Sequence, residues 1–178
     1  MKENVLPTLI FLCLLLLFPE KILSTESIEM QLNSIRTALV AGATEMSFNH
    51  VTQKNLYDLI DGGAEVYIRA GLIKGFHQKL KKDSALVLEI MVMQMKNSRK
   101  ADKLQKNQKG SNADCGSLTQ VPDVFFCHEE ASGGVFSVSS FDNYYVELTI
   151  WGKTSKKTGA ALTEKTLSKI YHAISKGS

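Results

Sequence analysis

One extended segment limits the fold of this chain more than any other. Residues 85–92 read ALVLEIMV, with apolar side chains at both alternating positions, so both faces of a strand formed here would be hydrophobic. Such a strand suits the interior of a sheet better than its edge. The polar residues at 81–84 separate it from another extended run that begins at Phe76, and together the two runs predict a β-hairpin over residues 76–95.

Helical periodicity predicts helices before and after this hairpin, and apolar runs bounded by turn residues predict further strands. The expected helices cover residues 27–40, 52–71 and 98–107 and a C-terminal segment with Leu167, Ile170, Tyr171 and Ile174 on one face, and the other expected strands cover 124–128, 135–141 and 144–151. Helices that flank hairpin-linked strands favour an α+β fold, with an antiparallel sheet of roughly four to five strands packed against about three to four helices.

The composition fits one domain. The chain has 178 residues, 44% of them hydrophobic, which is enough for one core but too little for two full domains. We place that domain at residues 26–178. The formal net charge of +3 is well below that of a dedicated nucleic-acid binder, so we expect no nucleic-acid partner.

The N-terminus predicts export. Residues 5–18 form an apolar run that is shorter than the roughly 17–25 residues of a bilayer-spanning helix, but it is typical of the centre of a secretory signal. Ser24 and Thr25 follow as small residues near which a peptidase could cut, so we assign residues 1–25 as a signal segment. Ile22 stands where a small residue would be preferred, so an uncleaved N-terminal anchor stays a second interpretation.

Export changes how the cysteines are interpreted. Once Cys13 is removed with the signal segment, Cys115 and Cys127 are the only two left, and an isolated pair in an oxidising compartment is a disulfide candidate. Closing so short a loop would contribute roughly 3 kcal/mol. The alternative is a buried free thiol at Cys127 and a loop thiol at Cys115. The chain has no CxxC motif that would indicate a zinc ribbon or a redox site.

The stretch LYDLIDGGAEVYIRAG at residues 56–71 is apolar around most of a helical wheel. Gly62 and Gly63 interrupt it, although glycine inside a helix costs about 1 kcal/mol relative to alanine. Two reasons could favour them, namely close approach of another backbone across Gly63 or a break that bends the helix near Gly62. We expect the former, a deeply packed helix whose crowding explains its composition.

The same stretch resembles the signature of an uncharacterised family of exported bacterial proteins, in which the pattern reads Leu-Tyr-Asp-Tyr-Ile-Asp-Gly-Ala-Ala-Glu-Leu-Tyr. The match is good over Leu56–Gly71 and continues weakly through residues 86–95 and 144–146. The resemblance implies a periplasmic or extracellular protein of the bacterial envelope. It implies no activity, because the family has none established.

Polar residues of this stretch form one candidate binding site, made of Asp58, Asp61, Gly62, Gly63, Glu65 and Arg69. The three acids are spaced so that they could coordinate a divalent cation or form an acid–base pair. Alternatively, they form a solvated helix face on which Glu65 pairs with Arg69, or they fix a neighbouring loop.

Three methionines form a candidate metal site. Met91, Met93 and Met95 alternate along the predicted strand and point to one face, and converging thioethers select Cu(I). The alternative is core packing, since methionine fills irregular gaps between a sheet and a helix.

Cations line one broad face of the predicted helix at 98–107. The sequence favours a plain solvated face, and the alternative is that this face contacts an anionic lipid or an envelope polymer. The residues concerned are Lys96, Arg99, Lys100 and Lys103.

No motif in the sequence indicates catalysis. The tripeptide at 152–154 lacks the preceding glycine of a phosphate-binding loop, the histidines are scattered, and no serine has the context of a nucleophile elbow. We therefore assign no catalytic residue and no cofactor. The sequence favours a non-catalytic binding or envelope-associated module, and the alternatives are a cation-dependent enzyme using the three acids or a Cu(I)-binding protein.

Overall fold

A computed structural model describes residues 25–60, 62–82, 85–110, 115–117, 121, 124–129, 134–152 and 154–177. The chain divides into two compact units, residues 1–30 and residues 31–178, and the division falls within the first described helix. All contacts discussed below lie within residues 31–178. Within the described residues, no helix is long and apolar enough to cross a membrane.

The described strands form one antiparallel sheet of seven strands in the order β1-β2-β3-β7-β6-β5-β4. They are β1 (Thr44–Val51), β2 (Leu72–Lys81), β3 (Val87–Met95), β4 (Cys115–Ser117), β5 (Val124–Glu129), β6 (Gly134–Phe141) and β7 (Tyr144–Trp151). The α+β class and the antiparallel sheet are confirmed, and β3 is an interior strand as its two apolar faces predict. The strands β1 and β4, which the sequence did not indicate, extend the sheet at its two edges.

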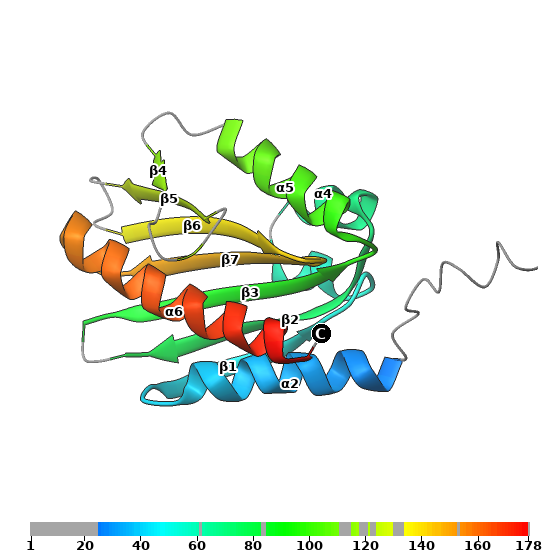
Figure 1. Ribbon diagram of the computed structural model, residues 1–178, viewed down its shortest axis with the longest axis horizontal. Coiled ribbons are helices and arrows are strands. Elements are labelled where there is room, and N and C mark those ends of the chain that lie inside the picture. The colour runs from blue at the N-terminus through cyan, green and yellow to red at the C-terminus, as the bar shows by residue number, and fades with distance from the viewer. Residues whose placement is uncertain are drawn as a thin grey trace, which may run out of the picture. The chain divides into compact units, whose positions relative to one another are not determined.

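Helices lie on both faces of the sheet (Figure 1). They are α2 (Thr25–Val40), α3 (Leu56–Leu59), α4 (Ala64–Ala70), α5 (Ser98–Gly110) and α6 (Lys156–Gly177). Adjacent residues of a strand point to opposite faces. The hydroxyl of Tyr144 donates to Gln31 of α2, whose amide in turn donates to Ile174 of α6, whereas Tyr145 packs against Tyr67 of α4. The sheet therefore separates α2 and α6 from α4.

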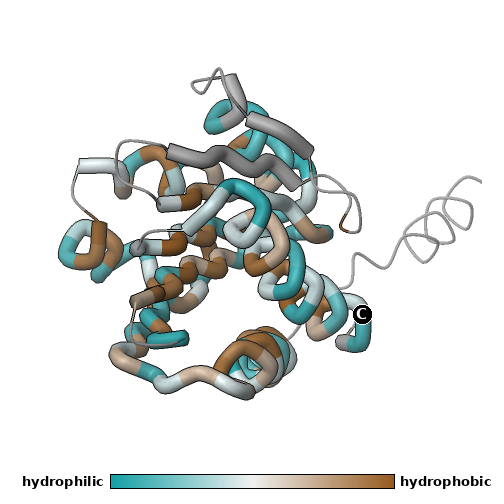
Figure 2. The backbone as a smooth tube through the Cα atoms, turned by 90° about the vertical axis from the view of Figure 1, so that its left-hand side faces the viewer, coloured by the Kyte–Doolittle hydropathy of each residue, from teal (hydrophilic) through white to brown (hydrophobic). Residues whose placement is uncertain are grey.

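The core has a part on each face of the sheet. On the side of α4 and α5, the three methionines of β3 pack with Tyr67, Tyr145 and Leu104 in one cluster of buried residues. On the other side, α2 and α6 bury Ile35, Leu39, Leu167 and Ile170. Figure 2 shows hydrophobic positions gathered along the strands. The central strands are therefore covered on both faces.

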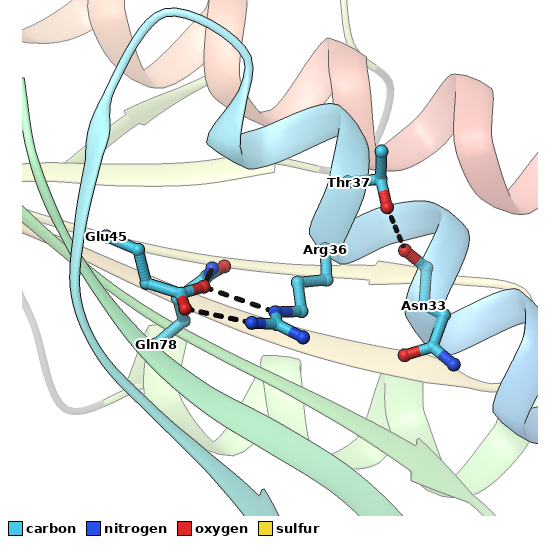
Figure 3. Close-up of polar contacts among 5 residues, drawn as sticks. All are labelled: Asn33, Arg36, Thr37, Glu45 and Gln78. Atoms are coloured by element: carbon cyan, nitrogen blue, oxygen red, sulfur yellow. Dashed lines mark hydrogen bonds and ion pairs between the residues drawn. The ribbon is translucent and has the colours of Figure 1, made fainter.

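A bidentate ion pair joins α2 to the edge of the sheet (Figure 3). Arg36 Nη2 lies 2.8 Å from Glu45 Oε1, and Nε lies 3.2 Å from Oε2. Gln78 of β2 also donates to Glu45, and the Arg36 guanidinium lies 3.9 Å from the centre of the Phe48 ring. The hydrogen bond from Arg36 outweighs desolvation and holds the pKa of Glu45 below its usual value. Arg36 thus links α2 to β1, and Gln78 extends this contact to β2 through Glu45.

The expected helix over residues 52–71 is broken, which corrects the prediction of a continuous buried helix. Its first part ends at Leu59, Ile60 is extended, and Gly62 has a φ of 72° before α4 begins at Ala64. Gly62 is exposed, and a methyl group on it would meet nothing beyond its chain neighbours within 4 Å. Glycine is favoured here because the backbone turns into the left-handed region, and crowding plays no part.

We expect Gly62→Ala to lower the free energy of unfolding by about 1 kcal/mol, because a Cβ disfavours the left-handed conformation. Gly63→Ala is the matched control. Gly63 has a φ of −102° and its nearest neighbours would lie 4.0 Å from a new Cβ, so a change of only about 0.5 kcal/mol is expected. Urea denaturation of both variants measures the difference, and equal losses would contradict the assignment.

Candidate functional site

An open groove of about 240 Å³ lies between α4 and α5. Each helix contributes side chains spaced three and four residues apart, which therefore share one side of that helix. The groove is lined by Val66, Arg69, Ala70, Lys100, Lys103, Leu104 and Asn107. We call this feature the basic groove, because all of its charged side chains are cations.

The two helices are held in place by their buried sides. Ala64 and Tyr67 anchor α4 in the core, and Ala101 and Leu104 anchor α5. Gly71 ends α4 with a φ of 94°, as the sequence predicts for a helix end. Leu104 and residues that flank these buried positions form the walls of the basic groove.

The charges in the basic groove are only weakly compensated. Arg69 Nε lies 2.9 Å from Glu65 Oε2, which confirms the expected pair, but the Arg69 side chain is 81% exposed and such surface pairs are weak. The hydroxyl of Tyr57 also donates to Glu65, and chiefly this contact holds the pKa of Glu65 below its usual value. Asp102, the acid of α5, accepts a hydrogen bond from Ser140 of β6 at 2.7 Å. Neither acid lines the groove.

The structure separates the predicted basic face into two parts. Lys100 and Lys103 line the basic groove together with Arg69, whereas Lys96 and Arg99 are exposed and do not line it. The sequence assigned Arg69 to the acidic stretch and the lysines to a separate face. Their convergence on one groove is a product of the fold.

The candidate cation site at Asp58, Asp61 and Glu65 stays a prediction. Asp58 is exposed, and Asp61 lies outside the described residues. Glu65 is exposed and bound to Tyr57 and Arg69. Within the described part of the chain, no group of three or more His, Cys, Asp or Glu side chains is placed to hold a metal ion.

The methionines of β3 are buried. Met91 is 6% exposed, and Met93 and Met95 are 0% exposed, within the apolar cluster under α4 and α5. A Cu(I) site would need sulfur atoms that an ion can reach. Packing, the alternative that the sequence left open, accounts for their positions.

The backbone register supports the predicted disulfide. Strands β4 and β5 pair with Cys115 directly opposite Cys127. Directly opposed residues of antiparallel strands have Cα atoms about 4.5–5.5 Å apart, within the range of about 4.4–6.8 Å that disulfides span. The disulfide stays a prediction, but the pairing gives it a physical basis that sequence spacing alone did not.

Sequence reasoning missed a buried carboxyl group on β7. Glu147 Oε1 accepts hydrogen bonds from the hydroxyls of Tyr67 at 2.6 Å and Tyr145 at 2.7 Å. Burial raises the pKa of Glu147, and these donors and the nearby His77 only partly oppose the rise. Burial also raises the pKa of both tyrosines, which therefore keep their protons at neutral pH. The sequence feature that could have revealed this group is Glu147 itself, the one acid in the mostly apolar run YYVELTIW at residues 144–151.

A second polar cluster joins β2, β3 and β7. Glu89 accepts a hydrogen bond from Trp151 Nε1 at 2.7 Å, and it lies 2.7 Å from His77 Nε2 and 3.2 Å from Lys79 Nζ. Burial opposes ionisation of Glu89, but the three partners outweigh it and hold its pKa below the usual value. This cluster links three strands, and Glu89 was visible in the sequence as the acid within ALVLEIMV.

No protein-family model and no curated protein matches the sequence. Among solved structures, the extracellular domain of PknH from Mycobacterium tuberculosis is similar, with a TM-score of 0.54 and 12% identity over 83% of this chain and 91% of that domain. This likeness shows a shared fold. An uncharacterised protein from Mycobacterium smegmatis matches with a TM-score of 0.40 and 15% identity over 79% of this chain and 95% of that chain, which is too low to support a common fold.

We expect Glu147→Gln to change how stability depends on pH. A folded pKa above the unfolded value means that Glu147 contributes stability below its unfolded pKa and that this contribution is lost as pH rises through the folded pKa. The variant should therefore gain stability relative to the wild type as pH rises above about 4, the ordinary pKa of a glutamate. Urea denaturation at a series of pH values measures the difference.

Tyr67→Phe is the companion variant, because it removes one donor and leaves Glu147 harder to ionise. Its stability should fall relative to the wild type as pH rises, which is the opposite trend. A pH-independent difference in both variants would contradict the raised pKa of Glu147.

A disulfide between Cys115 and Cys127 should stabilise the fold by roughly 3 kcal/mol. Alkylation of unfolded, unreduced protein from an oxidising compartment should modify neither cysteine, as read by peptide mass spectrometry. Cys127→Ser should lower the stability of the protein by a similar amount, whereas Cys13→Ser should not change it. Alkylation of both Cys115 and Cys127 before reduction would refute the pairing.

Proposed function

We propose that the protein is an exported, non-catalytic module of the bacterial envelope that binds an anionic partner through the basic groove. The observation that carries this proposal is the convergence of Arg69, Lys100 and Lys103, from two helices, on a groove that no acid lines. A solvated basic face would need no such convergence. Cations gathered on a concave surface raise the local concentration of an anionic ligand.

Three further observations support export. The apolar run at residues 5–18 has the length and flanks of a secretory signal, cleaved or retained as an anchor. The extracellular domain of PknH shares the fold, so the architecture occurs outside the cell in another protein. The signature at Leu56–Gly71 resembles exported bacterial proteins and contributes Val66, Arg69 and Ala70 to the groove.

The binding test uses a soluble polyanion. Fluorescence anisotropy with labelled polyphosphate should show saturable binding that weakens as salt rises. The variant Lys100→Gln/Lys103→Gln should bind roughly tenfold more weakly, since each cation contributes up to about 1 kcal/mol near a charged surface.

The matched control is Lys156→Gln/Lys157→Gln, which removes the same charge from two exposed residues that do not line the groove. Figure 1 shows the start of α6 at the other end of the sheet from α4. The control should change affinity by less than about twofold. Equal losses in the two double variants would mean that only net charge matters, and the proposal would fail.

A further inference from the structure

We infer that the anionic partner is a membrane lipid and that the basic groove takes the phosphate-bearing headgroup of an anionic phospholipid. This inference rests on the proposed function and names the chemical class of its ligand. Anion binding alone does not explain why apolar side chains line part of the groove.

The lining of the basic groove is amphipathic. Beside the three cations it includes Val66, Ala70 and Leu104, and Leu104 is continuous with the buried core. A fully hydrated polyanion needs cations but gains nothing from apolar walls. A phospholipid places its phosphate next to its acyl chains, so it complements a groove in which cations and aliphatic side chains alternate.

Exposed hydrophobic side chains gather on the same segment of the chain. Tyr57 of α3 is 53% exposed, Val66 of α4 is 49% exposed and Ile73 at the start of β2 is 44% exposed, and of these three Val66 lines the groove. The Tyr57 hydroxyl is held by Glu65, which fixes the ring at the start of α4. Amphipathic tyrosine, aliphatic side chains and neighbouring cations are the composition of a segment that rests on a bilayer surface.

The size of the groove fits part of a lipid. Pockets that enclose a whole small ligand usually measure about 300–1,000 Å³. The basic groove measures about 240 Å³ and is open. It can take a phosphate and a glycerol group, with the first methylene groups of the acyl chains against its apolar wall, while the rest of each chain stays in the bilayer, so binding would be peripheral.

The test measures co-sedimentation of the full chain with phosphatidylcholine vesicles that contain 30 mol% phosphatidylglycerol or none. The N-terminal apolar run can bind either vesicle, so the readout is the excess binding that phosphatidylglycerol causes. We expect Lys100→Gln/Lys103→Gln to lower this excess by about 25-fold, at roughly fivefold per cation. Lys156→Gln/Lys157→Gln should lower it by less than about twofold.

Val66→Gln separates a lipid from a soluble anion, because Val66 is half exposed and glutamine is a good helix former. It should weaken vesicle binding roughly threefold more than it weakens polyphosphate binding. Circular dichroism of each variant checks that the fold is retained. Equal weakening toward polyphosphate and vesicles would overturn the role of the apolar wall and with it the lipid assignment.

Free glycerol 3-phosphate separates a lipid headgroup from a soluble phosphate ester. At millimolar concentration it should not displace the protein from phosphatidylglycerol vesicles, and displacement at micromolar concentration would overturn the inference. Binding to polyphosphate without any excess on phosphatidylglycerol would refute the lipid and leave the proposed function standing. Failure to bind either probe would refute both.

Discussion

The fold depends on the burial of β3 and β7 on both of their faces. Ile90 and Leu148 are fully buried on one face, and Met93 and Tyr145 are fully buried on the other. Strands of this kind are stable only when a layer of helices covers each side of the sheet. The long helices α2 and α6 cover one face. The other is covered by α5 and by a helix of only seven residues, α4, and the basic groove lies between these two.

A helix as short as α4 is unstable without tertiary contacts. Gly62 sets its direction of entry and Gly71 ends it, so the backbone is turned at both ends by glycines with positive φ. Between them, Tyr67 reaches into the core. Residues 56–71 therefore form a short, bent segment that packs against the sheet. One side of this segment is buried, and the other side is accessible to a ligand.

The sequence predicted the α+β class, the β2–β3 and β6–β7 hairpins, and the helices α2, α5 and α6, because each depends on local periodicity or turn chemistry. It missed β1, of whose side chains only that of Val51 is fully buried, and β4, which has three residues. It predicted one helix over residues 52–71, because the spacing of apolar residues continues across a break that is caused by the backbone conformation at Gly62. The groove could not be predicted, since Arg69 and Lys103 are brought together only by the packing of α4 beside α5.

The buried acid on β7 has a structural explanation within this arrangement. Burial that raises the pKa of a carboxyl group is often a sign of catalysis, but Glu147 accepts hydrogen bonds from Tyr67 and Tyr145, two tyrosines of the core. One of these donors, Tyr67, belongs to α4 and is adjacent in sequence to Val66 and two residues from Arg69. The hydrogen bond at 2.6 Å thus ties the wall of the basic groove to a central strand. This contact from Glu147 is one of those that hold the seven-residue helix α4 against the sheet.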